Sequence, residues 1–368
     1  MVSAALSRWR IEGGDSRVLG VVRAAVGVLL LLQAFGAARS LQADGYFGDH
    51  FHLPLIAPSL VPPRSVYAAM LALQLLLAAA VIVGRGARPA LLVCASIGIY
   101  LLLCDRLQFH HNRYALFCYA WLLSFSPCDQ NLVAGRPSRA SPAHGPLWAA
   151  RLMQLQCILI YLGSGGSKLL DPDWRGGLVL FDRFARYGEQ ALSRGVPPSL
   201  VEALSRAETT SLLAKIAIAT ELGLAVGLMF RRTRVVALWW GVWFHLTIEV
   251  TSKVEGFTWL TLAAYALFAT HDGRARKLRW NPASLRGRAC GRLIMAIDWL
   301  SRFDARAWTP DSVASHHAVV IVDRDGARHT GLHALTAVAR TCPLLFPMWG
   351  PLALVSVLTR RAATRSWS

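Results

Sequence analysis

Residues 66–84 read VYAAMLALQLLLAAAVIVG, nineteen positions without a charged side chain. A second apolar run follows at residues 88–104. About 20 apolar residues in a helix cross the hydrocarbon core of a bilayer. Across all 368 residues, 54% are hydrophobic and only 16% are charged, whereas soluble proteins carry roughly a quarter of charged residues. The sequence therefore predicts a polytopic membrane protein and excludes a soluble enzyme, a disordered chain and a secreted disulfide scaffold.

Apolar runs separated by polar residues extend from the N-terminal region to residue 270. We expect an all-α polytopic membrane domain over residues 1–270, with about eight transmembrane helices. The fourth run is short, which is typical of a tilted or half-buried span. The predicted spans are 18–37, 66–84, 90–104, 114–125, 147–170, 211–230, 235–250 and 257–270.

The basic residues predict the orientation of these spans. The net charge is +18, and membrane proteins concentrate Lys and Arg in short cytoplasmic loops. This pattern favours membrane lipids over nucleic acid as the partner of the positive charge. It places both termini in the cytoplasm and residues 168–211 outside. The basic positions on the inner side are Arg8, Arg10, Arg17, Arg85, Arg88, Arg136, Arg139, Arg231, Arg232, Arg234, Arg274, Arg276, Lys277 and Arg279.

Residues 271–368 differ in kind from the spans. They carry 15 basic and 6 acidic side chains, so we expect this tail to lie against the anionic inner leaflet. A β-branched run at 317–323 precedes a turn, and a helical pattern follows at 332–340. The apolar stretch 343–358 is interrupted by Pro347 and Pro351, which argues against a ninth span. The tail is predicted to be a small cytoplasmic α/β module.

Ionisable groups inside spans are costly, at roughly 2.5–3.5 kcal/mol each on insertion scales, and they mark candidate sites. Lys168 ends the fifth span directly after the glycine–serine segment 163–167. Small residues allow helices or a flat ligand to approach closely. Apolar burial lowers a lysine pKa, which would make Lys168 a general base. The alternative is a lysine that reaches the outer interface with its long side chain.

Two further spans carry ionisable groups. His245 and Glu249 are four residues apart and share a helix face, which is compatible with a ligand site or with an ordinary interhelical contact. Lys215 and Glu221 are six residues apart, so they lie on opposite faces and each requires another partner. No CxxC pair and no zinc-ligand spacing occurs among the seven cysteines, and no metal site is expected.

Three segments resemble the membrane domain shared by vitamin K-dependent gamma-glutamyl carboxylase and its bacterial relatives, the horizontally transferred transmembrane (HTTM) domain. Together they cover roughly residues 18–270. The resemblance is carried by His111-Asn112-Arg113-Tyr114, by Tyr161, Gly165, Lys168-Leu169 and Asp173-Trp174-Arg175-Gly176, and by Phe244-His245, Phe257-Thr258-Trp259 and Tyr265-Ala266-Leu267-Phe268.

The resemblance implies a lipid quinol site in a bacterial plasma membrane. In the carboxylase, a lysine at the position of Lys168 acts as base toward reduced vitamin K. Oxygen then generates a strong base, and CO2 adds to a glutamate of a peptide substrate. By this resemblance Lys168 is catalytic, and Asn112, Arg113, Tyr161, Trp174, His245 and Glu249 bind substrate or quinol. Arg113 stands where the carboxylase has a histidine, so it can hold a carboxylate but cannot transfer a proton.

The tail resembles the DCC thiol-disulfide family, which uses a thioredoxin-like CxxC motif. The first cysteine of that motif is expected at Gly287, and only Cys290 remains, so the tail is interpreted as degenerate. The resemblance is carried by Arg288, Cys290, Trp299, Asp304, Asp325, Gly326, Ala334 and Pro343.

The sequence thus predicts a membrane-embedded, carboxylase-like protein with a reduced quinone cofactor and O2 and CO2 as co-substrates. The alternative is a non-catalytic accessory membrane protein that helps to mature or export a peptide. A transporter is disfavoured, because the two halves lack matching interrupted spans.

Overall fold

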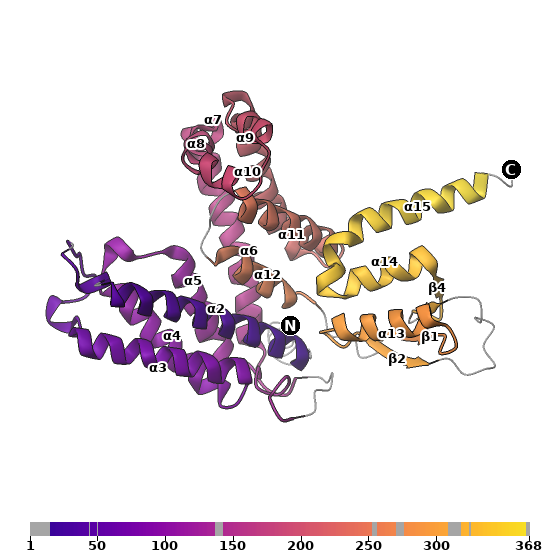
Figure 1. The fold of residues 1–368 in the computed structure, drawn as a ribbon, viewed down its shortest axis with the longest axis horizontal. Helices are drawn as coiled ribbons and strands as arrows, with labels where there is room; N and C mark the ends of the chain where they lie inside the picture. The colour runs from indigo at the N-terminus through magenta and orange to yellow at the C-terminus, as the bar shows by residue number, and fades with distance from the viewer. Residues whose placement is uncertain are drawn as a thin grey trace, which may run out of the picture. The chain divides into compact units, whose positions relative to one another are not determined.

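A computed structural model describes residues 15–43, 45–49, 51–136, 143–251, 256–269, 276–307, 318–323 and 325–365. Among these, the residues up to 269 and the residues from 276 onward form two separate compact units (Figure 1). The first unit is helical and the second contains a small sheet. The predicted basic residues Arg8, Arg10, Arg139 and Arg274 lie outside the described residues.

Each of the eight predicted apolar runs lies on a helix of the first unit. Three further helices lie in the long connection between the fifth and sixth of these runs. The helices are α2 (Ser16–Gln42), α3 (Arg64–Val83), α4 (Ala87–Leu103), α5 (His111–Ser124), α6 (Trp148–Leu170), α7 (Pro172–Gly176), α8 (Leu178–Ser193), α9 (Pro198–Leu204), α10 (Ala207–Met229), α11 (Arg234–Thr251) and α12 (Phe257–Ala266).

Within the described part of the chain, three helical segments are long and apolar enough to cross a membrane: Ser16–Phe47, Arg64–Val83 and Ala207–Met229. This finding indicates a membrane protein. The helices α4, α5 and α12 have 17, 14 and 10 residues, and α6 and α11 do not reach the hydropathy of the three candidate spans. The eight-span arrangement therefore stays a prediction.

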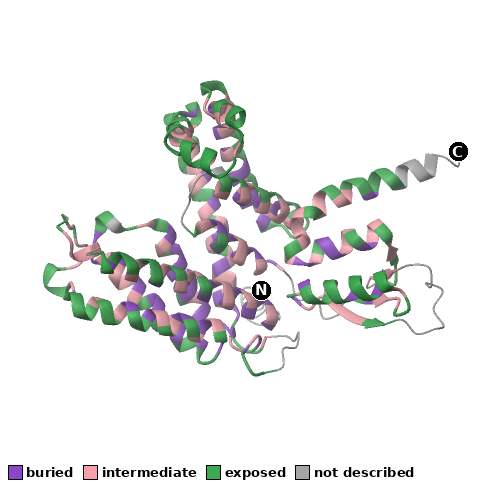
Figure 2. Ribbon diagram, in the orientation of Figure 1, coloured by how far each residue is buried: buried purple, intermediate pink, exposed green. Residues whose placement is uncertain are grey.

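The helices of the first unit pack in two connected groups. α2, α3, α4 and α5 pack against one another, and α10 packs against both α6 and α11. α12 contacts α2, α6 and α11, and so links the groups. Figure 2 shows that buried residues gather where these helices face one another, while α8 is exposed along much of its length.

A fully buried arginine fixes one end of the first group. Arg23 of α2 donates to the carbonyl oxygens of Cys128, Asn131 and Leu132 at 3.3, 3.3 and 2.6 Å. Its guanidinium also packs on Gly84, where φ is +87° and a Cβ atom would lie 2.4 Å from Arg23 Nη1. A charge within the first apolar run is thus accommodated by backbone acceptors of a neighbouring loop.

The second unit has a four-stranded mixed sheet in the order β2-β1-β3-β4. β1 runs parallel to β2 and antiparallel to β3, and β3 pairs antiparallel with β4. The core residues Leu278, Ile321, Ile297 and Val338 come from β1, β3 and two helices. The elements are β1 (Arg276–Trp280), α13 (Leu285–Ile297), β2 (Phe303–Ala307), β3 (Val319–Val322), β4 (Arg328–Thr330), α14 (Gly331–Thr341) and α15 (Trp349–Arg365).

The α/β prediction for the tail is correct in class but incomplete. The predicted strand at 317–323 is β3, and the predicted helix at 332–340 is α14. β1, β2 and β4 were not predicted, because arginines interrupt the alternation of apolar residues in these short segments. The stretch around Pro347 forms the 3-10 helix Pro343–Met348, and Pro351 falls in the first turn of α15, where proline is tolerated.

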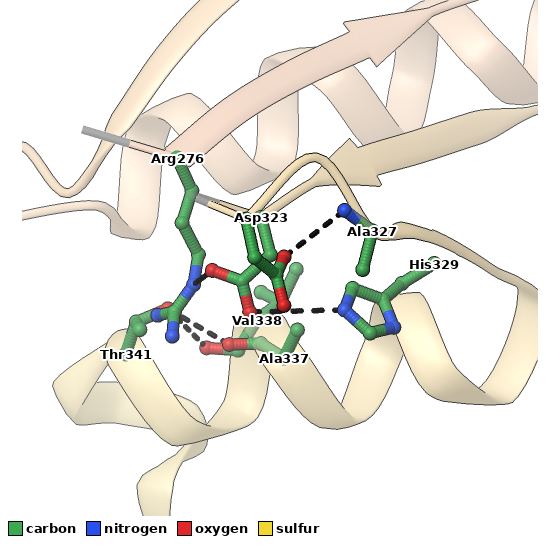
Figure 3. A network of polar contacts seen from close by, with 8 residues as sticks. Arg276, Asp323, Ala327, His329, Ala337, Val338 and Thr341 are labelled. Atoms are coloured by element: carbon green, nitrogen blue, oxygen red, sulfur yellow. Dashed lines mark hydrogen bonds and ion pairs between the residues drawn. The ribbon is translucent and has the colours of Figure 1, made fainter. Parts of the chain in front are cut away.

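An ion-pair network holds β1 to the β3–β4 hairpin (Figure 3). Arg276 Nε donates to Asp323 Oδ1 at 2.9 Å, and Asp323 Oδ2 lies 3.7 Å from His329 Nε2. The amide of Asp323 also donates to the carbonyl of Ala327 at 2.8 Å. Arg276 is the first residue of β1, so the network fixes the strand at its start.

Candidate functional site

The last two turns of α6 carry the polar residues of the candidate site. Gly165 and Lys168 face α10, whereas Gly163 and Gly166 have no atom within 4 Å of an added Cβ. At Gly165, a Cβ would meet Leu222 at 3.0 Å and Glu221 at 3.1 Å. The glycine–serine segment therefore allows close helix approach at this one glycine.

Lys168 is bound within the protein by three groups. Its amine forms an ion pair with Glu221 of α10 and donates to Ser164 Oγ at 2.9 Å. The ring of Trp174 lies over the amine at 4.8 Å, a favourable cation–π distance. The side chains of Lys168 and Glu221 are 17% and 7% exposed. We call Ser164, Lys168, Trp174 and Glu221 the lysine cluster.

The aspartates beside Lys168 have other roles. Asp171 caps α7, and its carboxylate accepts from the amides of Asp173 and Trp174 at 2.9 and 3.4 Å. Asp173 is exposed. Lys168 accordingly turns toward α10 rather than toward these carboxylates. Its partner Glu221 was recognised in the sequence as a costly intramembrane carboxylate, but its pairing with Lys168 was not predicted.

The carboxylate of Glu221 retains one oxygen for another contact. Oε1 is paired with Lys168, while Oε2 is buried and has no hydrogen-bond partner among the described residues. A buried carboxylate oxygen without a donor carries a desolvation cost of about 1–3 kcal/mol or more. A ligand hydroxyl donating to Oε2 would remove this cost.

A second group of polar side chains lies further along α6 toward its N-terminus. The Tyr161 hydroxyl is 2.5 Å from His245 Nε2 and 2.5 Å from the Tyr265 hydroxyl. His245 is fully buried, and its Nδ1 has no partner within the described residues. We call Tyr161, His245 and Tyr265 the histidine cluster. Tyr265 was absent from the predicted site residues.

The two clusters share α6. Tyr161 and Lys168 are seven residues apart, which is two turns or about 10 Å along the helix axis. Glu249 lies one turn beyond His245 on α11, and its buried Oε2 has no partner in the described part of the chain. Among the predicted site residues, the structure therefore brings Trp174 onto Lys168 and His245 onto Tyr161, while Glu221 and Tyr265 join them as residues that were not predicted for the site.

Asn112 and Arg113 occupy a different element. They begin α5, where His110 Nδ1 caps the helix by accepting from the amide of Asn112 at 3.3 Å. Asn112 is buried, and Arg113 lies within electrostatic range of Tyr67 on α3. The rings of His110 and His111 stack at 4.8 Å. The described residues contain no group of three or more His, Cys, Asp or Glu side chains that fits a metal ion.

The connection before α5 is stabilised by Asp105. Its carboxylate contacts His52 Nδ1 at 3.0 Å and accepts from the amides of Leu107 and Leu53 at 3.0 and 3.2 Å. Burial alone would raise the pKa of Asp105, but these hydrogen bonds favour its charged form and lower the pKa below 3.8. The carboxylate thus fixes the loop that precedes Asn112.

In the tail, neither thiol lies at the start of α13, α14 or α15. Ser284 caps α13, and its hydroxyl accepts from the amide of Gly287 at 3.3 Å. Cys290 is exposed in the second turn of the helix, and Cys342 is buried in the core. Burial raises the pKa of Cys342 to about 12, which keeps this thiol protonated and unreactive at neutral pH.

Comparison with known proteins gives a family for the helical unit. The model of the HTTM domain matches residues 12–272. No curated protein and no solved structure matches the chain. The matched residues include both the lysine cluster and the histidine cluster, and they extend over well more than half of the sequence. The chain therefore belongs to the HTTM domain family.

Proposed function

We propose that this HTTM domain binds an amphiphile with a weakly acidic hydroxyl, of the lipid quinol class, and removes its proton at the lysine cluster. The observation that carries the proposal is the Lys168–Glu221 pair, buried among apolar helices with Glu221 Oε2 unpaired within the described residues. HTTM domains occur in vitamin K-dependent carboxylase-like membrane proteins, which agrees with this class of ligand.

Lys168 and Glu221 act as a unit in this proposal. A hydroxyl that donates to Glu221 Oε2 lies beside the lysine amine, because both oxygens belong to one carboxylate. When the hydroxyl passes its proton to Glu221 Oε2, the carboxylate becomes neutral, and the resulting oxyanion remains next to the Lys168 ammonium. A fixed charge in a water-poor site stabilises such an anion more than it would in water. Trp174 covers the amine and limits the access of water.

A reduced quinone, with O2, would supply the strong base that a carboxylase-like reaction with CO2 requires. The residues of this chain provide the site. The lysine cluster orients and deprotonates the hydroxyl, and the histidine cluster offers His245 Nδ1 as a further buried acceptor or donor. Arg113 and Asn112 are proposed to hold the carboxylate of a peptide substrate. Both residues lie on α5, whereas the lysine cluster is formed by α6, α7 and α10.

The proposed topology has eight spans with both termini in the cytoplasm of a bacterial plasma membrane. In this arrangement the C-terminal end of α6, the start of α5 and the end of α11 all lie toward the outer side. Lys168, Arg113 and Glu249 would then share one side of the membrane. The basic loops at Arg85, Arg136 and Arg231 support this orientation.

For the tail, we propose a degenerate DCC-like domain without dithiol chemistry. A parallel β1–α13–β2 unit followed by an antiparallel β3–β4 hairpin and a helix is the core arrangement of thioredoxin-like domains, which supports this reading. The start of α13, where such a domain carries its reactive cysteine, has Ser284 as the cap. The sequence resemblance places the first cysteine of the CxxC motif at Gly287, which is the third residue of α13.

The function is tested with the full chain in nanodiscs supplied with reduced vitamin K or reduced menaquinone. Mass spectrometry follows quinol consumption and its oxygenated product. Lys168→Met and Glu221→Gln should each abolish product formation. Lys215→Met and Glu202→Gln are matched controls, because Lys215 is exposed on α10 and Glu202 pairs with Arg206 at the surface. These controls should retain full activity.

The same material separates the carboxylase-like function from the accessory one. Lipid mass spectrometry of the purified protein should detect a bound quinone in the unaltered chain. If no quinone is bound and Lys168→Met leaves peptide maturation or export intact, the protein is an accessory factor and the quinol proposal is wrong.

A further inference from the structure

Helix α15 lies outside the α/β core of the second unit. One side of the helix packs on α14, where Thr336 Oγ1 donates to the carbonyl of Leu352 at 3.4 Å. Ser356 is buried on the same side and is hydrogen-bonded to His333. Within the described part of the helix, these contacts attach α15 to the unit through one face.

Among the residues of α15 up to Thr359, several apolar side chains away from α14 are exposed. Leu354, Val355, Val357 and Leu358 are between 47% and 62% exposed, and Leu344 and Met348 just before the helix are similarly open. Figure 2 shows this exposure along the helix. A contiguous apolar surface of this kind marks an interaction site on a protein.

The charge around this surface has one sign. No acidic residue follows Asp325 in the sequence, whereas five arginines do. Three of these, Arg360, Arg361 and Arg365, lie in the sequence of α15 after Leu358 and Thr359. The sequence of α15 therefore combines an apolar stretch with a cationic C-terminal segment.

We infer that α15 is a membrane-surface helix that binds anionic phospholipid, with its apolar side chains in the interface and its arginines on the headgroups. An apolar face combined with a basic segment supplies the two signals that stable binding to anionic lipid requires. The unit is joined directly to a membrane domain, so a bilayer is present at high effective concentration. A second copy of the tail is a poor partner, because each tail carries +9 and the two repel.

The inference is tested by photo-crosslinking the full chain in nanodiscs. p-Benzoylphenylalanine replaces Leu354 or Leu358, and mass spectrometry identifies adducts. Nanodiscs of phosphatidylcholine alone are compared with nanodiscs that also contain phosphatidylglycerol. Ala327, which is exposed in the β3–β4 turn beside Asp325, is the control position. The unfolding temperature of each variant checks that the fold is retained.

Phosphatidylglycerol adducts at 354 and 358, and none above background at 327, are the expected result. Arg360→Gln and Arg361→Gln should each reduce these adducts roughly fivefold, and added salt should do the same. Adducts to another part of the same chain or to a second copy would overturn the inference. So would equal labelling in neutral and anionic nanodiscs, because binding would then not depend on the arginines.

Discussion

The amine of Lys168 on α6 is paired with the carboxylate of Glu221 on α10, fifty-three positions later in the chain. Both side chains are largely buried, and only one oxygen of the carboxylate is used. The pair joins the two helices that contact each other most extensively around the candidate site. It therefore contributes both to the packing of the HTTM domain and to the chemistry proposed for it.

The energetic role of the pair is testable apart from any activity. Glu221→Gln leaves a buried lysine without its counter-charge, and breaking a buried pair costs about 3–5 kcal/mol. The double variant Lys168→Met/Glu221→Leu replaces both charges by apolar groups and should recover most of this loss. Thermal unfolding in nanodiscs measures both. If Glu221→Gln and the unaltered protein had the same unfolding temperature, the ion pair between Lys168 and Glu221 would not form.

Close approach of α6 and α10 depends on a single glycine. Gly165→Ala places a methyl group 3.0 Å from Leu222 and 3.1 Å from Glu221, so the helices must separate or the side chains must shift. Overpacking of this kind costs typically about 1–3 kcal/mol. Gly166→Ala meets no atom within 4 Å and serves as the control. We expect a lower unfolding temperature for the first variant only, and similar losses in both would contradict the packing described.

The Tyr161 hydroxyl is shared by His245 and Tyr265, so its loss affects two buried groups. Tyr161→Phe should destabilise the domain by about 1–3 kcal/mol for each group left unsatisfied. Tyr265→Phe removes only one of the two contacts and should cost less. Unfolding in a denaturant series gives the comparison. If Tyr265→Phe lost as much stability as Tyr161→Phe or more, the Tyr161 hydroxyl would not be the group that both His245 and Tyr265 share.

Asp105 should make the loop before α5 sensitive to acid. Because hydrogen bonds lower its pKa in the folded protein, the stabilisation is complete above the unfolded value of 3.8 and is lost as the pH falls below it. Asp105→Asn should therefore lower the unfolding temperature at neutral pH, and the difference should shrink below pH 3.8. A difference that stays constant with pH would assign the effect to packing instead of charge.

The sequence by itself indicated a membrane protein, predicted apolar helices that the described residues of the first unit contain, and singled out Lys168 as a candidate residue. Apolar run length and the placement of charge depend on neighbouring residues only, so a linear reading detects them. The glycine–serine segment likewise predicted close approach before Lys168. It did not indicate which of the glycines makes the contact. Gly165 does and Gly163 and Gly166 do not, because the contact depends on which face of the helix meets α10.

Only the tertiary structure decided the partners. Lys168 pairs with Glu221 and not with Asp171, three residues away, because the Asp171 carboxylate is engaged in capping α7. Tyr161, His245 and Tyr265 meet from three helices whose order in the sequence gives no sign of their contact. Strand β1 forms from an arginine-rich segment because Leu278 is buried in the core of the tail, while Arg276 and Arg279 pair with Asp323 and Asp304. These outcomes depend on packing between segments distant in the chain, which local pattern does not encode.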